Sequence, residues 1–216
     1  MMFSDLGFKR ILDVGANQGL WSRAAAKLFP EATFQLVEAN PGCEAFLKCN
    51  VSGTEDSVTL CEDRTNPSEK FPYVIALVGA EPKLHMPFYT LGPTATGASV
   101  YRETATGLYD HCKPIFLPQT TLDLLFPDDA FDLIKLDTQG SEIDILRGAE
   151  RLRTKADAIR TEVSVDAYNM CAPLKPEVID YMLSIGFPHW YVLDELRFGA
   201  QLIQQDILFV REKLRD

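Results

Sequence analysis

ILDVGANQGLWS, residues 11–22, decides how the rest of the 216-residue chain is interpreted. An apolar run ends at Val14, a turn bounded by Gly15 and Gly19 follows, and an amphipathic segment starts at Leu20. This order is typical of a buried strand that leads through a tight turn into a helix packed on the sheet. Because ligands of open parallel sheets bind beyond the carboxyl ends of the strands, we expect this turn to form the floor of a binding site.

The composition is that of one globular domain. With 46% hydrophobic and 24% charged residues, the chain can bury a substantial core, and we expect residues 1–216 to form a single domain. The 31 acidic residues outnumber the 21 basic ones, and the net charge of -10 argues against nucleic acid or an anionic membrane surface as a partner. The sequence has no apolar run of membrane-spanning length and no secretory signal pattern, so the expected location is the cytoplasm.

The cysteines do not point to a metal or redox site. They are 5 in number, and no two of them form a C-x-x-C pair. We interpret them as reduced structural thiols. The acidic residues around Asp128 resemble a solvated turn, so no metal is expected.

Apolar runs alternate with helical patterns along most of the chain, which is the signature of an α/β fold with a doubly wound, mostly parallel sheet. The predicted strands are residues 10–14, 33–38, 58–60, 73–78, 131–137 and 158–163. The predicted helices start after Gly19, at 41, after the turn at 138–142 and at 176. Two further apolar runs, 190–194 and 206–211, are joined by only about a dozen residues, so we expect an antiparallel hairpin at one edge of the sheet.

Each predicted helix should bury one stripe of apolar residues. In the first helix the stripe is Leu20, Ala24 and Leu28, with Trp21, Ala25 and Phe29 beside it. After residue 142 a single helix is expected to bury Ile145, Ala149 and Leu152, and the last helix should bury Val178, Ile179, Met182 and Leu183. These stripes predict which side of each helix faces the sheet.

Residues 89–114 interrupt this regular pattern. The stretch is rich in Gly, Thr and Pro and lacks apolar periodicity. Long irregular segments inside compact domains are usually binding loops or lids. We therefore expect an insert here that covers the substrate.

The glycine turn and the second predicted strand together suggest a nucleoside ligand. Gly15 can adopt backbone angles closed to other residues, and Gly19 lets the helix start close to the strand. The helix N-terminus offers free N–H groups to a carboxylate or phosphate. Glu38, at the end of the second strand, is placed to accept hydrogen bonds from two ribose hydroxyls. The predicted ligand is an adenosine with an anionic tail.

Two cofactor classes fit such a pocket. A dinucleotide fingerprint requires G-x-G-x-x-G, and its second glycine is missing here, which leaves an NAD-dependent oxidoreductase as the weaker alternative. Asp13 would lie badly beside a pyrophosphate, but its carboxylate could hold an ammonium group. S-adenosylmethionine carries both an ammonium group and a carboxylate, and it is the cofactor that we expect.

Several motifs together resemble one family. ILDVGANQGLWS, LVEANP, TTLDLL, LIKLDTQGSEIDILRGAE, TEVS, IGF and QQDILFVR occur in this order, and they resemble the FkbM family of S-adenosylmethionine-dependent methyltransferases over residues 11–211. The resemblance implies the seven-stranded methyltransferase fold and O-methylation of a hydroxyl on a sugar, polyketide or related small metabolite. The chain departs from the family at Gln139, where an acid is usual, and at an insertion over residues 61–72 that obscures the adenine contacts.

The resemblance also implies a cofactor site. The methionine end would be lined by Asp13, Gly15, Asn17, Gln18 and Gly19, with Ala16 and Ser22 in the same turn. The ribose would lie against Glu38, Ala39 and Asn40, and the sulfonium and transferred methyl near Asp137 and Thr138.

Three acids form the predicted catalytic set. Methyl transfer needs an aligned acceptor and a group that removes the hydroxyl proton. We hypothesise that Asp137, Glu142 and Glu162 form an acidic wall that orients the acceptor, and which of them is the base stays open. Glu142 could instead cap a helix, and Glu162 could pair with Arg160 or with a loop amide. A module that binds the cofactor without turnover is the alternative from a different functional class.

Overall fold

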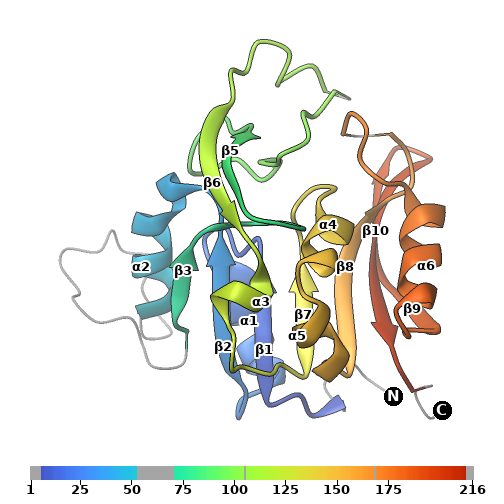
Figure 1. The fold of residues 1–216 in the computed structure, drawn as a ribbon. Helices are drawn as coiled ribbons and strands as arrows, with labels where there is room; N and C mark the ends of the chain where they lie inside the picture. The colour runs from blue at the N-terminus through green and yellow to red at the C-terminus, as the bar shows by residue number, and fades with distance from the viewer. Residues whose placement is uncertain (1–5, 53–70, 105, 168, 213–216) are drawn as a thin grey trace.

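The computed structural model describes residues 6–52, 71–104, 106–167 and 169–212, and a seven-stranded sheet forms its centre (Figure 1). The strands lie in the order β3-β2-β1-β7-β8-β10-β9. Their bounds are β1 Arg10–Val14, β2 Thr33–Glu38, β3 Tyr73–Ile75, β7 Leu133–Leu136, β8 Ala158–Ser164, β9 His189–Phe198 and β10 Gln201–Val210. Neighbouring strands are parallel except at β10, which is antiparallel to both β8 and β9. The predicted doubly wound sheet with an antiparallel C-terminal hairpin is confirmed.

The strand order reverses at β1, and this reversal positions the functional site. β2 and β3 lie on one side of β1, whereas β7 and β8 lie on its other side. Asp13 is in register with Leu36 of β2 and with Lys135 of β7. In doubly wound sheets, a crevice opens at such a point beyond the carboxyl ends of the strands.

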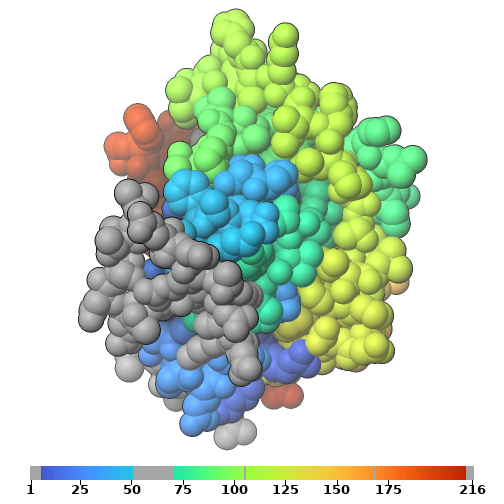
Figure 2. All heavy atoms as spheres, turned by 90° about the vertical axis from the view of Figure 1, so that its left-hand side faces the viewer, coloured from blue at the N-terminus to red at the C-terminus, as the bar shows by residue number. Residues whose placement is uncertain are grey.

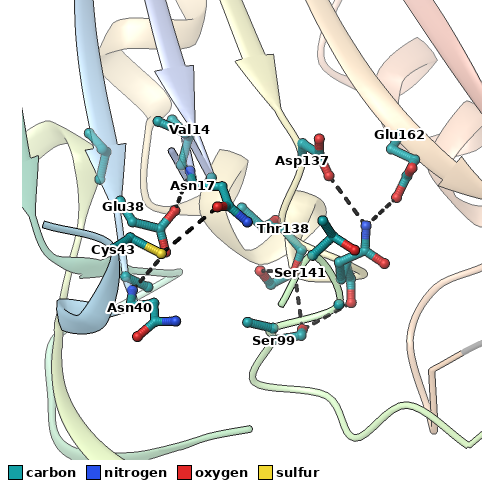
Figure 3. A pocket seen from close by; sticks show the side chains of 18 of the residues that line it. Val14, Asn17, Glu38, Asn40, Cys43, Ser99, Asp137, Thr138, Ser141 and Glu162 are labelled. Atoms are coloured by element: carbon teal, nitrogen blue, oxygen red, sulfur yellow. Dashed lines mark hydrogen bonds between the residues drawn. The ribbon is translucent and has the colours of Figure 1, made fainter. Parts of the chain in front are cut away.

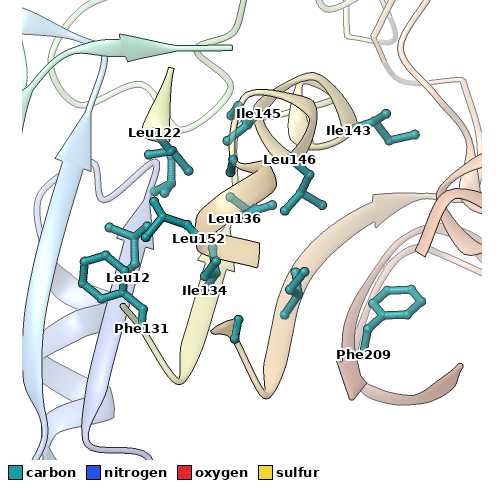
Figure 4. Packing of buried hydrophobic residues seen from close by; sticks show 14 of the residues in the cluster. Leu12, Leu122, Phe131, Ile134, Leu136, Ile143, Ile145, Leu146, Leu152 and Phe209 are labelled. Atoms are coloured by element: carbon teal, nitrogen blue, oxygen red, sulfur yellow. The ribbon is translucent and has the colours of Figure 1, made fainter. Parts of the chain in front are cut away.

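Helices cover both faces of the sheet (Figure 1). They are α1 Leu20–Leu28, the 3₁₀ turn η2 Pro41–Cys43, α2 Glu44–Ser52, α3 Leu122–Leu125, α4 Glu142–Arg147, α5 Glu150–Lys155 and α6 Lys175–Ser184. Leu12 and Ile134 face a buried cluster that includes residues of α3 to α6, part of which Figure 4 shows. Ile11 and Leu133 face a second cluster with α1 and α2. Successive strand residues point to opposite faces, so these continuous apolar runs serve both layers.

No helix in the described part of the chain has the length and apolar character needed to cross a membrane.

Helix α1 buries only part of the stripe predicted for it: Ala25 and Phe29 are buried as predicted, whereas the row of Leu20, Ala24 and Leu28 is exposed. Its buried side carries Ser22 and Ala25, whereas Leu20 is 59% exposed and Leu28 is 50% exposed. The Ser22 hydroxyl donates a 2.6 Å hydrogen bond to the buried carboxylate of Asp13. This polar contact holds the Ser22 side of the helix toward the sheet and leaves the leucine stripe in solvent.

The single helix predicted after residue 142 is two helices, α4 and α5. Gly148 lies at the break between them, and a Cβ on it would be 2.0 Å from the carbonyl oxygen of Gly79. The backbone after β4 (Leu77–Val78) thus passes too close for any residue but glycine. Ile145, Ala149 and Leu152 are nevertheless all buried, as predicted. Leu183 of α6 is 46% exposed, contrary to prediction.

A second sheet of three strands, in the order β4-β6-β5, is absent from the sequence-based prediction. The apolar run 73–78 divides between the two sheets, since β3 pairs with β2 whereas β4 pairs with β6 (Ile115–Thr120). β6 also pairs antiparallel with β5 (Lys83–Phe88). Apolar side chains of this sheet face solvent, with Leu84 81% exposed and Phe116 63% exposed, so the alternating pattern of a half-buried strand is missing.

The irregular segment 89–114 connects β5 and β6 and lies beyond the carboxyl ends of the parallel strands (Figure 1). Figure 2 shows its yellow-green part at the upper end of the molecule. Isolated antiparallel bridges join Tyr89 to Ser99 and Glu103 to Asn169. The predicted strand 58–60, and the insertion at 61–72 up to residue 70, lie outside the described residues.

Candidate functional site

A cavity of about 440 Å³ opens at the carboxyl ends of β1, β2, β7 and β8 (Figure 3). Its walls include the glycine turn, residues 37–40, residues 137–139 and residues 95–100 of the irregular segment. Glu162 of β8 and Gln204 of β10 also line it. Ligand sites commonly enclose roughly 300–1,000 Å³. The cavity therefore has the size of a ligand site and lies where the glycine turn predicts one.

The turn after β1 requires glycine at its first position. Gly15 has φ 77°, and a Cβ on it would lie 1.9 Å from the carbonyl oxygen of Asp137. Its amide donates to the carbonyl of Val37 at 2.9 Å, so the turn connects the ends of β1, β2 and β7. Gly19 has φ 74° and precedes α1, which no side chain caps. The N-terminus of α1 can therefore offer backbone N–H groups to a ligand.

Asp13 and Ser22 lie beneath the turn rather than in the cavity wall. Both residues are fully buried at 0% exposure. The Ser22 hydroxyl donates to Asp13 Oδ2, and Nζ of Lys135 lies 3.0 Å from Asp13 Oδ1. A direct contact of Asp13 with an ammonium group, or of Ser22 with the cofactor, is not compatible with this burial. The two residues support the turn from below because β1 directs the Asp13 side chain toward α1.

Lys135 is a charged residue that the sequence analysis missed. Its side chain is 6% exposed, and Nζ lies 3.4 Å from both Asp137 Oδ2 and the carbonyl oxygen of Gly15. Burial lowers the pKa of Lys135, but the carboxylates of Asp13 and Asp137 raise it more strongly, so it lies above its ordinary value. A signal was present in the run LIKL, because a lone lysine in a buried strand needs a buried partner.

Glu38 ends β2 with its carboxylate fixed by backbone donors. The N–H of Asn17 donates to Oε2 and that of Asn40 to Oε1, both at 2.7 Å (Figure 3). Glu38 is buried, and burial raises its pKa although these hydrogen bonds lower it. Each carboxylate oxygen keeps a further acceptor position, so the pair can still accept two hydroxyls of a diol.

The side chains of Asn17 and Asn40 connect the irregular segment to the cavity. Asn17 Nδ2 donates to the carbonyl of Ala95 and Asn40 Nδ2 to that of Gly92, each at 3.1 Å. Asn40 Oδ1 accepts the N–H of Gly42 at 3.0 Å. The Asn40 side chain, predicted at the ribose, is thus engaged by the chain itself. Both asparagines line the cavity and bind the irregular segment through these hydrogen bonds.

The other predicted cofactor residues lie close by. Ala16, Gln18, Ala39 and Thr138 line the cavity, whereas Gly19 does not. Cys43 lines it as well, and its thiol lies 3.3 Å from the carbonyl oxygen of Pro93. Burial raises the pKa of Cys43 to about 12, so this thiol stays protonated and is a poor nucleophile.

Glu142 stabilises the turn after β7 and does not line the cavity. Its Oε1 accepts the N–H of Thr138 at 3.0 Å, the Thr138 hydroxyl at 3.0 Å and the N–H of Gly140 at 3.1 Å. Burial raises the pKa of Glu142, although these hydrogen bonds lower it. Of the two roles considered for Glu142, this geometry fits the capping role, and the predicted place of Glu142 in the acidic wall is not compatible with it.

Glu162 and Asp137 meet at one amide group (Figure 3). Nε2 of Gln139 donates to Glu162 Oε2 at 2.5 Å and lies 3.3 Å from Asp137 Oδ1. Nε2 of Gln204 donates to the same Glu162 oxygen at 2.9 Å. Burial, followed by the charges of Asp137 and other nearby acids, raises the pKa of Glu162 to about 8. Arg160 pairs with Asp206 instead, so the alternative pairing of Glu162 with Arg160 is not found.

The backbone at Gln139 is held in an unusual conformation. Its φ is 56°, in the left-handed region that few non-glycine residues adopt. Ser99 Oγ lies 2.9 Å from the Gln139 carbonyl oxygen, and Asn169 Nδ2 donates to it at 2.7 Å. The irregular segment therefore also fixes the residue that bridges the two acids. Sequence analysis identified Gln139 only as a departure from the family, and nothing local marked Gln204.

Comparison with known proteins identifies the family. The sequence profile described as the methyltransferase FkbM domain matches residues 13–188. The chain belongs to the FkbM methyltransferase family. A search of curated proteins gives no significant match.

Solved structures of similar fold are distant in sequence. An FkbM methyltransferase from Methylobacillus flagellatus KT has a TM-score of 0.56 at 16% identity, over 93% of this chain and 43% of the other. The N-terminal domain of EvdMO1 with SAH bound has a TM-score of 0.55 at 11% identity, over 96% and 76%. An O-methyltransferase family protein from Burkholderia thailandensis has a TM-score of 0.52 at 8% identity, over 98% and 53%. The chain thus spans less than half of the Methylobacillus protein.

Membership of a methyltransferase family agrees with S-adenosylmethionine, the cofactor expected from the sequence, and not with NAD. The residues present fit S-adenosylmethionine. Gly15 and its neighbours line the cavity with small residues at the end of β1, and Glu38 presents a fixed carboxylate at the end of β2. Asp137 adds a half-exposed carboxylate, 41% exposed, where a positively charged group could lie.

Proposed function

We propose that this FkbM methyltransferase transfers a methyl group to a hydroxyl of a sugar, polyketide or related small metabolite. The observation that carries the proposal is Glu162 in the cavity wall, with a pKa raised to about 8. A carboxyl with a pKa near the working pH can take up a hydroxyl proton during the reaction, which an ordinary carboxylate does less effectively. An amine acceptor would not need such a base to the same degree.

The geometry of Glu162 supports a role as general base. Two amides, from Gln139 and Gln204, bind Oε2, while no hydrogen bond from the described residues reaches Oε1. Oε1 is therefore available to an acceptor hydroxyl. Transfer forms the bond between the acceptor oxygen and the methyl carbon, breaks the bond between carbon and sulfur, and delivers the hydroxyl proton to Glu162.

Asp137 supports binding more than rate. When bound, S-adenosylmethionine supplies an electrophilic methyl group on a positively charged sulfur, and this charge disappears during transfer. A carboxylate beside the sulfur therefore favours the ground state. Asp137 reaches the cavity from the end of β7, next to the glycine turn, and so is suited to this role. The two acids of the wall would then divide the work, with Asp137 for the cofactor and Glu162 for the acceptor.

The lining of the cavity supports an uncharged, hydroxyl-bearing acceptor. The amides of Gln139 and Gln204 lie against Glu162, and the cavity is also lined by Trp21 and Leu196. Apolar surface with a few fixed polar groups is typical of small-molecule sites. The EvdMO1 N-terminal domain, whose fold is similar at TM-score 0.55 and 11% identity, was crystallised in the presence of SAH and D-fucose. A sugar is thus the first acceptor class to test.

We also propose that residues 89–114 act as the cover of the site. Their hydrogen bonds to Asn17 and Asn40, and the contact of Ser99 with the Gln139 carbonyl, support this role. Opening the cover would break contacts with the same residues that line the cavity. Cofactor exchange should therefore be coupled to motion of this segment.

The test is methyl transfer from labelled S-adenosylmethionine to a panel of sugars, polyketides, amines and thiols. Label in an ether, located by NMR or fragmentation of the product, is the expected result. Label on nitrogen or sulfur would contradict the proposal. Cofactor binding by calorimetry without transfer to any hydroxyl acceptor would favour the non-catalytic binding module.

A further inference from the structure

We infer that Lys135 is a positioning residue that joins the glycine turn and the carboxylate of Asp137 into one buried ionic unit, and that this unit sets the affinity of the site for its nucleoside cofactor. The inference rests on the proposed role of Asp137 in cofactor binding. It assigns a function to a lysine that neither contacts the acceptor base Glu162 nor belongs to the glycine turn itself.

The unit is formed by neighbouring strands in register. Asp13 of β1 is paired with Lys135 of β7, so both side chains point to the α1 face of the sheet. Nζ of Lys135 lies 3.0 Å from Asp13 Oδ1, 3.4 Å from Asp137 Oδ2 and 3.4 Å from the Gly15 carbonyl oxygen. One ammonium group thus contacts the strand before the turn, the turn and the cavity wall.

Each carboxylate in the unit is also held at its second oxygen. Asp13 Oδ2 accepts the Ser22 hydroxyl, and Asp137 Oδ1 lies 3.3 Å from Gln139 Nε2. The indole of Trp21 lies over Lys135, with Nζ 5.4 Å from the ring centroid. The lysine therefore has little freedom to move, and Asp137 is fixed between Lys135 and Gln139.

The carboxylates hold the pKa of Lys135 above its ordinary value, so the ammonium group stays charged. The unit then contains one positive and two negative groups. If only net charge mattered, removing the lysine would leave the site more negative and strengthen the binding of a cationic cofactor. If Lys135 positions Asp137 and Gly15, its removal should weaken binding. For a variant that lacks only Lys135, the two explanations therefore predict opposite changes in affinity for the cofactor.

The simple variant Lys135→Met leaves the buried Asp13 unpaired and should lower Tm, because an uncompensated buried charge is strongly destabilising. The double variant Asp13→Asn with Lys135→Met removes both buried charges and should recover most of that loss. Its Asp137 nevertheless lacks the ammonium group. If Lys135 is only the counter-ion of Asp13, the double variant should bind the cofactor like the unmodified chain. If Lys135 positions Asp137, the double variant should still bind more weakly.

The experiment measures binding of S-adenosylmethionine and S-adenosylhomocysteine to the full chain by calorimetry, with Tm of each variant in parallel. We expect the double variant to bind S-adenosylmethionine about tenfold more weakly than the unmodified chain, the size of a typical coupling between contacting groups, and to lose less affinity for S-adenosylhomocysteine, which lacks the positive charge on sulfur. Wild-type or tighter binding by the double variant would overturn the inference.

A second arm does not depend on folding of the buried variants. Asp137 is half-exposed, so Asp137→Asn should fold and should itself reproduce the loss of affinity. If it binds with wild-type affinity, Lys135 has nothing to position and the inference fails. In the Asp137→Asn background, the double variant at Asp13 and Lys135 should add little further loss.

The matched control neutralises the ion pair of Arg160 and Asp206, in the variant Arg160→Met with Asp206→Asn. Arg160 is in register with Lys135 and also lies against Trp21, but neither residue of the pair contacts Asp137 or Gly15 among the described interactions. Nucleoside affinity should be unchanged, and a loss equal to that of the Lys135 variants would count against the inference. Because no acceptor is present, failure to find an O-methylated product would leave these results intact.

Discussion

The two ends of the cavity hold their acids in different ways. At the β2 end, the Glu38 carboxylate accepts backbone N–H groups from Asn17 and Asn40, which belong to the adjacent turns. At the β8 end, the Glu162 carboxylate accepts hydrogen bonds from the side-chain amides of Gln139 and Gln204, which lie far from Glu162 in the sequence. Backbone donors are present whatever the side chain, whereas side-chain donors change with single substitutions. If the cavity binds its ligands as proposed, the nucleoside end at Glu38 tolerates changes of the donor side chains, whereas the acceptor end at Glu162 is altered by single substitutions.

The acids also differ in what surrounds them. Burial raises the pKa of both Glu38 and Glu162. The charges of three nearby acids, Asp137, Glu142 and Asp206, raise the pKa of Glu162 further. No cation pairs with Glu162 in the described residues, whereas Lys135 pairs with Asp137 on the neighbouring strand. Asp137 and Glu162 lie in the same wall but have different partners, so they are suited to different tasks: Asp137 as a fixed negative charge and Glu162 as a proton acceptor.

The largest effect should come from forcing the glycine turn away from the end of β7, at the Glu38 end of the cavity. In Gly15→Ala, the new methyl group would meet the Asp137 carbonyl oxygen at 1.9 Å, on a backbone with φ 77°. We expect loss of measurable S-adenosylhomocysteine binding and a destabilisation of about 3 kcal/mol or more, from strain and forced displacement of β7. Calorimetry and thermal unfolding measure both.

Gly7→Ala is the matched control for this variant. Gly7 has φ 63°, but no described residue has an atom within 4 Å of a Cβ built on it. Its substitution introduces the backbone strain alone, far from the cavity, so binding should be retained. If both variants bind the nucleoside normally, the close approach of the turn to β7 is not essential to the site.

The next largest effect should distinguish the Glu162 end of the cavity, which we expect to affect rate, from the Glu38 end, which we expect to affect nucleoside binding. Glu162→Gln removes the proposed base and should lower kcat by about 10²–10⁴-fold, while S-adenosylhomocysteine affinity changes little. In the unmodified enzyme the rate should rise with pH through about 8, since the active form is the ionised carboxylate and its fraction grows as pH exceeds the pKa. The variant should lose this limb of the pH–rate profile. An unchanged profile would assign the base elsewhere.

A smaller change should tune the acceptor end without destroying it. Gln204→Met removes one of the two amides that stabilise the ionised form of Glu162. A hydrogen bond to a charged group contributes about 1.5–3 kcal/mol, so the midpoint of the pH–rate profile should move up by about one pH unit or more. A profile that moves down, or not at all, would show that Gln204 does not stabilise the carboxylate.

The smallest catalytic effect is expected at Glu142, although it was predicted as part of the acidic wall. Glu142→Gln keeps an oxygen that can accept the N–H groups of Thr138 and Gly140. We expect a loss of about 1 kcal/mol in stability and no shift of the pH–rate profile beyond that caused by removing one remote charge. A loss of kcat as large as that of Glu162→Gln would restore Glu142 to the catalytic set.

The regular part of the fold followed from local patterns. β1 and β2 have the bounds predicted from their apolar runs, and the C-terminal hairpin pairs antiparallel as the short connection required. The second sheet could not be predicted in the same way, because β4 has two residues and Leu84 and Phe116 expose apolar side chains. The buried face of α1 was predicted only in part, at Ala25 and Phe29, because hydrophobic periodicity does not register the hydrogen bond between Ser22 and Asp13.

In the candidate site, too, some features follow from the local sequence and others only from the tertiary structure. By itself, the sequence determined the sheet, the turn that requires Gly15, and the acid at the end of β2, because each depends on residues close together in the chain. The tertiary structure alone decided the partners of the buried charges. Lys135 reaches the Gly15 carbonyl across 120 residues, and Gln204 reaches Glu162 across 42. The local sequence can show that a buried charge needs a partner, as the lysine in LIKL does, but it does not show which residue another strand brings to it. In a buried site that partner decides which charge is balanced and which acid holds its proton.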